Sequence, residues 1–130
     1  MKPSLFTSLA QLLGRILMSA IFIMAGFSKL GAGYAATQGY MASMGVPGSL
    51  LPLVIALEIG GGLAILLGWQ TRLAAWLLAG FCIVAAVIFH ANFSDQMQMI
   101  LFMKNLAMAG GFLFLASGPI HAWSLDGRHG

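Results

Sequence analysis

The most prominent pattern in the chain is a set of four long apolar stretches separated by short polar or glycine-containing connections. The stretches cover about residues 12–30, 50–69, 73–90 and 97–117. Each is close to the 20 or so residues that a helix needs to cross the hydrocarbon core of a bilayer. The pattern predicts four transmembrane helices, and the short connections predict that successive helices are antiparallel neighbours in an up-down bundle.

The longest connection, residues 31–49, carries a weaker helical signal of its own. Gly31 should end the first span, and residues 35–44 predict a short helix at the membrane interface. Tyr34 and Tyr40 would then lie at headgroup depth, where aromatic residues are enriched.

Composition supports the membrane interpretation and excludes several functions. The chain is 60% hydrophobic and 7% charged, whereas ordinary soluble chains are about 25% charged. We therefore expect a single all-α transmembrane domain over residues 1–130, with the lipid bilayer as its main partner. A net charge of +3 is too small for a nucleic-acid-binding surface. The single cysteine, Cys82, excludes a thiol–disulfide relay and is expected to be a buried apolar residue.

The basic residues that flank the spans predict the orientation in the membrane. Lys2, Arg15, Arg72 and Arg128 lie at the N-terminus, in the link between spans two and three, and in the tail, whereas the other two connections hold no basic residue apart from Lys29 at a helix edge. Because cytoplasmic loops carry an excess of Lys and Arg, both termini should face the cytoplasm of a bacterial inner membrane.

Glu58 is the most informative single residue because it is the only acid inside any of the apolar stretches. An unpaired charge near the bilayer centre costs several kcal/mol, so Glu58 should face the bundle interior and be paired. Counting residues along the helices brings Lys104 and Arg15 closest to its depth, and we expect one of them to be its partner.

The same depth argument predicts a polar pocket in the outer half of the bundle. Its candidate residues are Glu58, Lys104, Arg15, His90, Asn105 and Lys29. Cations in excess of the one acid would suit a carbonyl, a quinone oxygen or a small anion. The alternatives are ordinary structural roles: an ion pair that fixes packing, a solvated His90, an Asn105 that bridges helices, and a Lys29 that anchors the interface.

Small residues follow one another at four-residue steps through the second span, at Ala56, Gly60, Ala64 and Gly68. Such a stripe allows another helix to approach closely. We expect a helix-packing face here, within the bundle or against a partner protein.

Metal binding is a weaker alternative. Met41, Met44, Met97 and Met99 lie on the same side as His90, and thioether and imidazole ligands suit Cu(I). Packing is the default role for methionine in so apolar a chain, so no metal site is predicted. His90 and His121 lie at opposite ends of the bundle and could not ligate one haem iron.

Several short motifs follow one another along nearly the whole chain. They are Arg15, Gly26-Phe27-Ser28-Lys29-Leu30, Gly45-Val46-Pro47, Glu58 with Gly61 and Gly62, Gly68 with Arg72, and His90. Together they resemble the DoxX family of small bacterial membrane proteins, in particular its YqjF-type inner-membrane branch. The resemblance implies a four-helix inner-membrane protein. A related archaeal member is a subunit of a thiosulfate:quinone oxidoreductase, and other members accompany oxidative-stress or metal-handling proteins.

These observations together favour a component of a quinone-linked redox or detoxification system, with the polar pocket as a quinone site. The alternatives are a non-catalytic membrane subunit that docks a membrane or redox protein, or a copper-handling protein on the periplasmic side. Homo-oligomer formation and catalysis by the chain itself are left open by the sequence.

Overall fold

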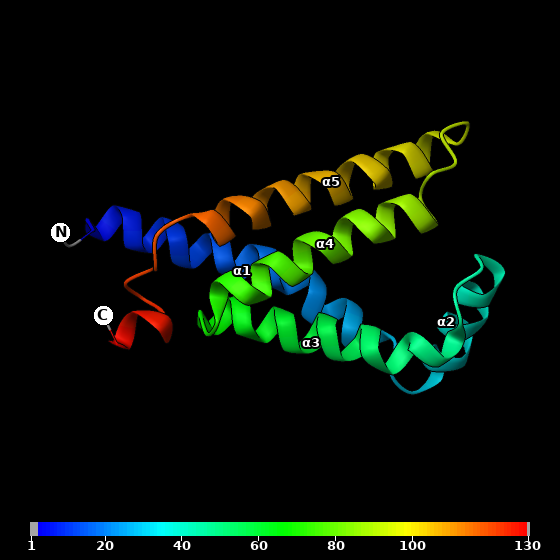
Figure 1. Cartoon of the computed structure of the whole chain (residues 1–130), viewed down its shortest axis with the longest axis horizontal. Helices are drawn as coiled ribbons and strands as arrows, with labels where there is room; N and C mark the ends of the chain where they lie inside the picture. The colour runs from blue at the N-terminus through cyan, green and yellow to red at the C-terminus, as the bar shows by residue number, and fades with distance from the viewer. Residues whose placement is uncertain (1–2, 130) are drawn as a thin grey trace.

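The computed structural model describes residues 3–129 and consists of helices joined by short connections (Figure 1). Four helices are long and apolar enough to span a membrane, so the all-α membrane fold is confirmed. The elements are α1 (Leu5–Ser28), α2 (Ala32–Ser43), the 3-10 turn η1 (Gly48–Leu50), α3 (Leu51–Leu67), α4 (Thr71–Phe89), α5 (Gln96–Ser117) and the 3-10 turn η2 (Asp126–His129). Lys2, one of the residues used to predict orientation, lies outside the described part.

The first spanning helix begins earlier than its hydropathy suggested. Helix α1 starts at Leu5 because Ser4 caps it, with the Ser4 hydroxyl accepting a hydrogen bond from the Thr7 amide at 3.0 Å. The span expected from residue 12 is therefore the continuation of a helix that is already formed. The short helix expected at residues 35–44 is present as α2, beginning at Ala32, and its location at the membrane interface stays a prediction.

Consecutive spanning helices run antiparallel and pack in the order α1–α3, α3–α4 and α4–α5. Both termini lie at the same end of the molecule, and α2 lies at the other end (Figure 1). Towards the α2 end, the α4–α5 hairpin diverges from the α1–α3 pair. The bundle is therefore closed near the termini and splayed near α2.

The closed half is held by a core of small and aromatic side chains. Phe22 of α1 makes edge-to-face contacts with Phe112 of α5 and Phe81 of α4, with ring centroids 5.4 and 6.4 Å apart. Cys82 is fully buried in this core, as the sequence predicted. Phe22 contacts both helices of the α4–α5 hairpin. It therefore joins the two halves of the bundle on the terminus side of the point where they separate.

Three glycines allow close contact between the helices. A Cβ at Gly62 of α3 would lie 2.8 Å from Ile23 Cγ1 on α1, and one at Gly26 of α1 would overlap Ile59 on α3. A Cβ at Gly61 would lie 3.1 Å from Leu78 on α4. Helix α3 thus presents one glycine to each of its two neighbours.

The expected packing stripe is wrong as a single face of the folded chain. Ala56 and Gly60 are exposed, and no atom lies within 4 Å of a Cβ built at Gly60, whereas Ala64 and Gly68 are buried. Each four-residue step exceeds one helical turn by about 40°, so three steps rotate the stripe by about 120°. The stripe therefore begins on the lipid-facing side of α3 and ends in the bundle. Docking of a partner on its exposed half stays a prediction.

The C-terminal tail folds back onto the turn between α3 and α4. The amides of Leu125 and Asp126 donate to the carbonyls of Leu67 and Gly68 at 3.0 and 2.8 Å. The Asp126 carboxylate accepts hydrogen bonds from the amides of Gln70 and Thr71 at 2.8 and 2.9 Å. It therefore provides acceptors for amides at the start of α4 that have no partner within the helix.

Candidate functional site

The splayed half of the bundle contains a cavity of about 500 Å³. Every helix from α1 to α5 contributes to its wall, and most of the lining side chains are aliphatic or aromatic. Its polar lining residues are Lys29, Thr37, Tyr40, Glu58, His90 and Asn105. Ile21 and Val84, which line it from within two membrane spans, are 53% and 55% exposed, so the cavity is open at membrane depth.

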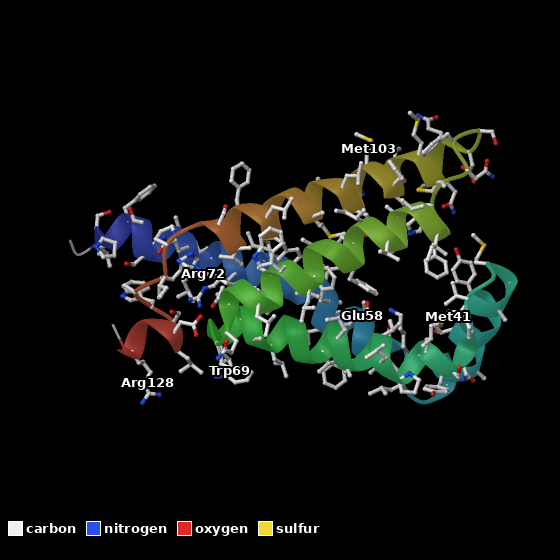
Figure 2. All side chains as sticks on the ribbon, viewed as in Figure 1. Met41, Glu58, Trp69, Arg72, Met103 and Arg128 are labelled. Carbon is white, nitrogen blue, oxygen red and sulfur yellow. The ribbon has the colours of Figure 1, made fainter. Side chains whose placement is uncertain are left out.

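The charged element of this cavity is an ion pair between Glu58 on α3 and Lys29 at the end of α1. Lys29 Nζ lies 2.8 Å from Glu58 Oε1, and the Glu58 side chain is 5% exposed. Figure 2 shows Glu58 projecting from the middle of α3 towards the space between the two halves of the bundle. The partner of Glu58 is therefore Lys29, and the expectation of Lys104 or Arg15 is wrong.

Helix direction explains this pairing. Side chains on a helix tilt towards its N-terminus, so Lys29 at the C-terminal end of α1 points back into the membrane, and its ammonium also donates to the Ala25 carbonyl at 3.2 Å. The close approach at Gly26, whose Cβ would lie 3.3 Å from Glu58 Cβ, brings α3 within reach. In the sequence, this pairing was indicated by Gly26, a glycine three residues before Lys29 at the end of the helix.

Lys104 lies outside the cavity. It is exposed on α5, and its neighbour Met103 points away from the other helices (Figure 2). The buried residues of α5 are Ala109, Phe112 and Ala116. Asn105 precedes them by 4, 7 and 11 residues, which keeps it on the same helix face, whereas Lys104 is rotated from it by about 100°. Asn105, not Lys104, therefore reaches the cavity.

Arg15 lies at the opposite end of the bundle from the cavity. It is 2% exposed and donates from Nη2 to the backbone carbonyl of Trp123 in the folded-back tail. Arg15 precedes Gly26, the contact point with Glu58, by eleven residues, or about 16 Å of helix. That distance exceeds what the side chain could span.

The tail around Arg15 contains two titratable groups with shifted pKa values. Burial, followed by the nearby charge of Arg15, lowers the pKa of His121. Burial alone would raise the pKa of Asp126, but hydrogen bonds from Thr71 and Gln70, together with the charge of Arg15, hold it below its usual value. Both shifts favour the protonation states found near neutral pH.

Hydrogen bonds orient the remaining polar residues of the cavity. His90 Nδ1 lies 2.9 Å from Oε1 of Gln98, so the first turn of α5 holds the ring in place. Asn105 Nδ2 donates to the Leu101 carbonyl at 3.0 Å, and Thr37 Oγ1 donates to the Gly33 carbonyl at 2.7 Å. Of the six predicted pocket residues, the structure brings together Lys29, Glu58, His90 and Asn105.

Helix α2 adds two cavity residues that sequence reasoning did not assign to the pocket. Tyr40 stacks on Phe89 of α4 with ring centroids 5.4 Å apart, and Thr37 lies one turn earlier on α2. Tyr40 and Thr37 reach the cavity because α2 lies at the open end of the bundle. The only sequence signal was the aromatic residue at headgroup depth.

Of the four methionines proposed as copper ligands, only Met41 is among the residues that line the cavity with His90. Met44, Met97 and Met99 are exposed by 40%, 62% and 49%. Within residues 3–129, no group of three or more His, Cys, Asp or Glu side chains is placed to hold a metal ion.

Comparison with known proteins places the chain in a family. The sequence model of the DoxX family matches residues 10–91. The chain is 54% identical to inner membrane protein YqjF of Escherichia coli (strain K12) over 115 residues, which is 88% of each chain. It is 39% identical to inner membrane protein YphA of the same strain over 125 residues, covering 90% of this chain and 88% of YphA.

A more distant relative is the protein named "Putative oxidoreductase CatD" of Bacillus subtilis (strain 168). It is 29% identical over 118 residues, covering 85% of this chain and 86% of CatD. No solved structure matches the chain significantly. Since the family model spans more than half of the sequence and YqjF matches most of it, this four-helix membrane protein belongs to the DoxX family.

Proposed function

We propose that this DoxX protein binds a quinone-type molecule in the membrane-depth cavity, as a component of a quinone-linked redox or detoxification system. The observation that carries the proposal is the ion pair of half-buried Lys29 with buried Glu58 inside a largely apolar cavity that opens towards lipid. Small-molecule sites are typically apolar clefts of roughly 300–1,000 Å³ with a few polar groups that fix orientation. The cavity, at about 500 Å³, fits that description.

The lining residues suit a ring with oxygen substituents and an apolar tail. Lys29 donates to Ala25 and contacts Glu58, which leaves its third ammonium hydrogen for a ligand oxygen. The aliphatic walls suit the tail. His90, at the α2 end of the cavity, is placed to exchange protons with water. A bound quinone would supply the capacity to carry electrons, and a partner protein would have to deliver or remove them.

The names of the relatives support a location in the inner membrane and a role in redox chemistry. YqjF and YphA are named inner membrane proteins, and the name of CatD describes it as a putative oxidoreductase. We propose the same membrane for this chain, with both termini in the cytoplasm. Arg72 and Arg128 lie at the end that holds the termini (Figure 2), which is the arrangement expected for a cytoplasmic face.

A photoaffinity experiment tests the proposal. The protein in lipid nanodiscs would be illuminated with an azido-benzoquinone carrying a decyl tail, and labelled residues mapped by mass spectrometry. Labels should fall on cavity residues of α2 and α4, and an excess of decyl-benzoquinone should suppress them. Labelling confined to exposed lipid-facing residues, or labelling without competition, would contradict a quinone site.

A matched pair of substitutions controls for partition of the quinone into lipid. Ala85 lines the cavity, whereas Ala56 is exposed on α3, so the same change has opposite consequences at the two positions. Ala85→Trp should fill the cavity and abolish competable labelling, and Ala56→Trp should leave it intact. If a partner protein co-purifies with the wild type and is lost with Ala56→Trp, the docking function is supported instead.

A further inference from the structure

The hydrogen atoms of the polar residues that line the cavity are largely engaged already. Thr37 donates its hydroxyl hydrogen to Gly33, and Asn105 donates one amide hydrogen to Leu101. The partner of His90 Nδ1 is the carbonyl oxygen of Gln98, which can only accept. Nδ1 is therefore the donor in this contact, and in the tautomer that makes it Nε2 is left as an acceptor.

Glu58 adds the strongest acceptor in the cavity. A carboxylate offers about four lone-pair sites and no hydrogen of its own. Lys29 Nζ lies 2.8 Å from Oε1, and no other donor among residues 3–129 contacts the carboxylate, so most of its lone pairs are left for a ligand. With 4% exposure, Glu58 has little access to water. A buried acceptor without a donor is costly, so a ligand that donates to it gains affinity.

The balance of free groups therefore favours donors on the ligand. Within residues 3–129, the acceptors still free are the carboxylate of Glu58, Nε2 of His90, Oγ1 of Thr37, Oδ1 of Asn105 and the hydroxyl oxygen of Tyr40. In the same part of the chain, the donors still free are one ammonium hydrogen of Lys29, one amide hydrogen of Asn105 and the hydroxyl hydrogen of Tyr40. A quinone carbonyl can only accept, whereas a phenolic hydroxyl donates one hydrogen and also accepts one.

We infer that the cavity selects a ligand by a phenolic hydroxyl, so that it binds a quinol, the reduced form, in preference to the quinone. The hydroxyl would donate to the Glu58 carboxylate and accept from the free ammonium hydrogen of Lys29. This inference rests on the proposed function, because it concerns the head group of the molecule in the same cavity. It identifies the form of the ligand that arrives in the site as the reduced one.

The test compares four probes with the same decyl tail on wild-type protein in nanodiscs: the benzoquinone, its quinol under anaerobic reducing conditions, the dimethyl ether of the quinol, and 4-decylphenol. Competition against the azido-quinone label gives an apparent Kd for each. The quinol should bind at least about tenfold more tightly than its dimethyl ether, as expected for a hydrogen bond to a charged group. It should also bind more tightly than the quinone.

The phenol separates the two sources of a phenolic hydroxyl. If 4-decylphenol binds as tightly as the quinol, one hydroxyl is enough for recognition and the ligand class is phenolic in general. If it binds less tightly than the quinol but more tightly than the dimethyl ether, the protein also recognises the second hydroxyl of the quinol. Both results support the inference. Equal binding of the quinol and its dimethyl ether, or tighter binding of the quinone, would overturn it while leaving a quinone site in place. Failure of all four probes would overturn the proposed function as well.

Variants assign the preference to Glu58. Glu58→Gln replaces an acceptor-only group by one that carries its own hydrogens, so the ratio of quinol to dimethyl ether affinity should fall towards one. The double variant Glu58→Gln with Lys29→Met makes the same comparison without leaving Lys29 unpaired, in case the single variant does not fold. Lys104→Met, on the lipid-facing side of α5, should keep the wild-type ratio. An unchanged ratio in both Glu58 variants would contradict the inference.

Discussion

Breaking the Lys29–Glu58 pair should destabilise the protein in a way that depends on which partner is removed. Two unit charges 2.8 Å apart attract by about 6 kcal/mol at an effective dielectric constant of about 20, and much of that gain is offset by desolvation. The Lys29 side chain is 23% exposed and that of Glu58 is 5% exposed. An orphaned Lys29 can therefore recover some hydration, whereas an orphaned Glu58 cannot.

The expected costs follow from this asymmetry. Removing one member of a buried pair costs about 3–5 kcal/mol in soluble proteins, and membrane values are lower where water or snorkelling helps. We expect Lys29→Met to cost about 3–4 kcal/mol and Glu58→Gln about 2 kcal/mol, because the more exposed charge is the one left behind. The double variant should lie within about 1–2 kcal/mol of the wild type, since neither charge is then buried alone.

Unfolding in mixed micelles by titration with sodium dodecyl sulfate, followed by tryptophan fluorescence, measures these differences. Lys104→Met serves as the control and should change the free energy of unfolding by less than about 0.5 kcal/mol, as for an exposed position. A double variant whose loss equals the sum of the two single losses would refute the pairing. So would rescue of Glu58→Gln by Lys104→Met instead of by Lys29→Met.

Three further predictions use matched positions or conditions. Gly62→Ala should lower the melting temperature in detergent because its Cβ meets Ile23, whereas Gly60→Ala should leave it unchanged or raise it slightly; equal effects would contradict the observed α1–α3 contact. The pKa of His121 is lowered by folding, so its contribution to stability is complete above its ordinary value of 6.5 and is lost as the pH falls. Melting temperatures should therefore drop from pH 7.5 to pH 5, less so in His121→Asn, and a pH-independent melting temperature would contradict this. Reporter fusions at the C-terminus and within α2 should report opposite sides of the membrane, with the C-terminus cytoplasmic, and a periplasmic C-terminus would refute the orientation.

Much of the architecture could be predicted from the sequence because the bilayer imposes a simple requirement on hydrophobic length. Four spans, their antiparallel order and the short helix α2 all follow from the lengths of apolar stretches and connections. The same reasoning correctly identified Glu58 as a buried and paired group, since no other acid lies in a span. Depth along the bundle axis is what hydropathy and residue counting can measure.

Rotation about each helix axis is what those patterns could not measure. Lys104 and Asn105 are equally deep, and only the packing of Ala109 and Phe112 against the other helices decides which of the two faces the cavity. Arg15 was misplaced for another reason: its partner is the carbonyl of Trp123 in a tail that has no hydropathy signal. Tertiary contacts over long sequence separations therefore determine the parts of the site that the sequence left ambiguous.

The contact between Arg15 and the tail has a consequence for the way the protein is made. The two residues are separated by 108 positions, so α1 enters the membrane long before Trp123 has been synthesised. At about 5–20 residues per second, the guanidinium must wait roughly 5–20 seconds for its carbonyl partner. The last stretch of the chain thus supplies a hydrogen-bond acceptor for a buried residue of the first helix, and a nascent protein truncated before Trp123 would leave Nη2 of Arg15 without the bond that it makes in the full structure.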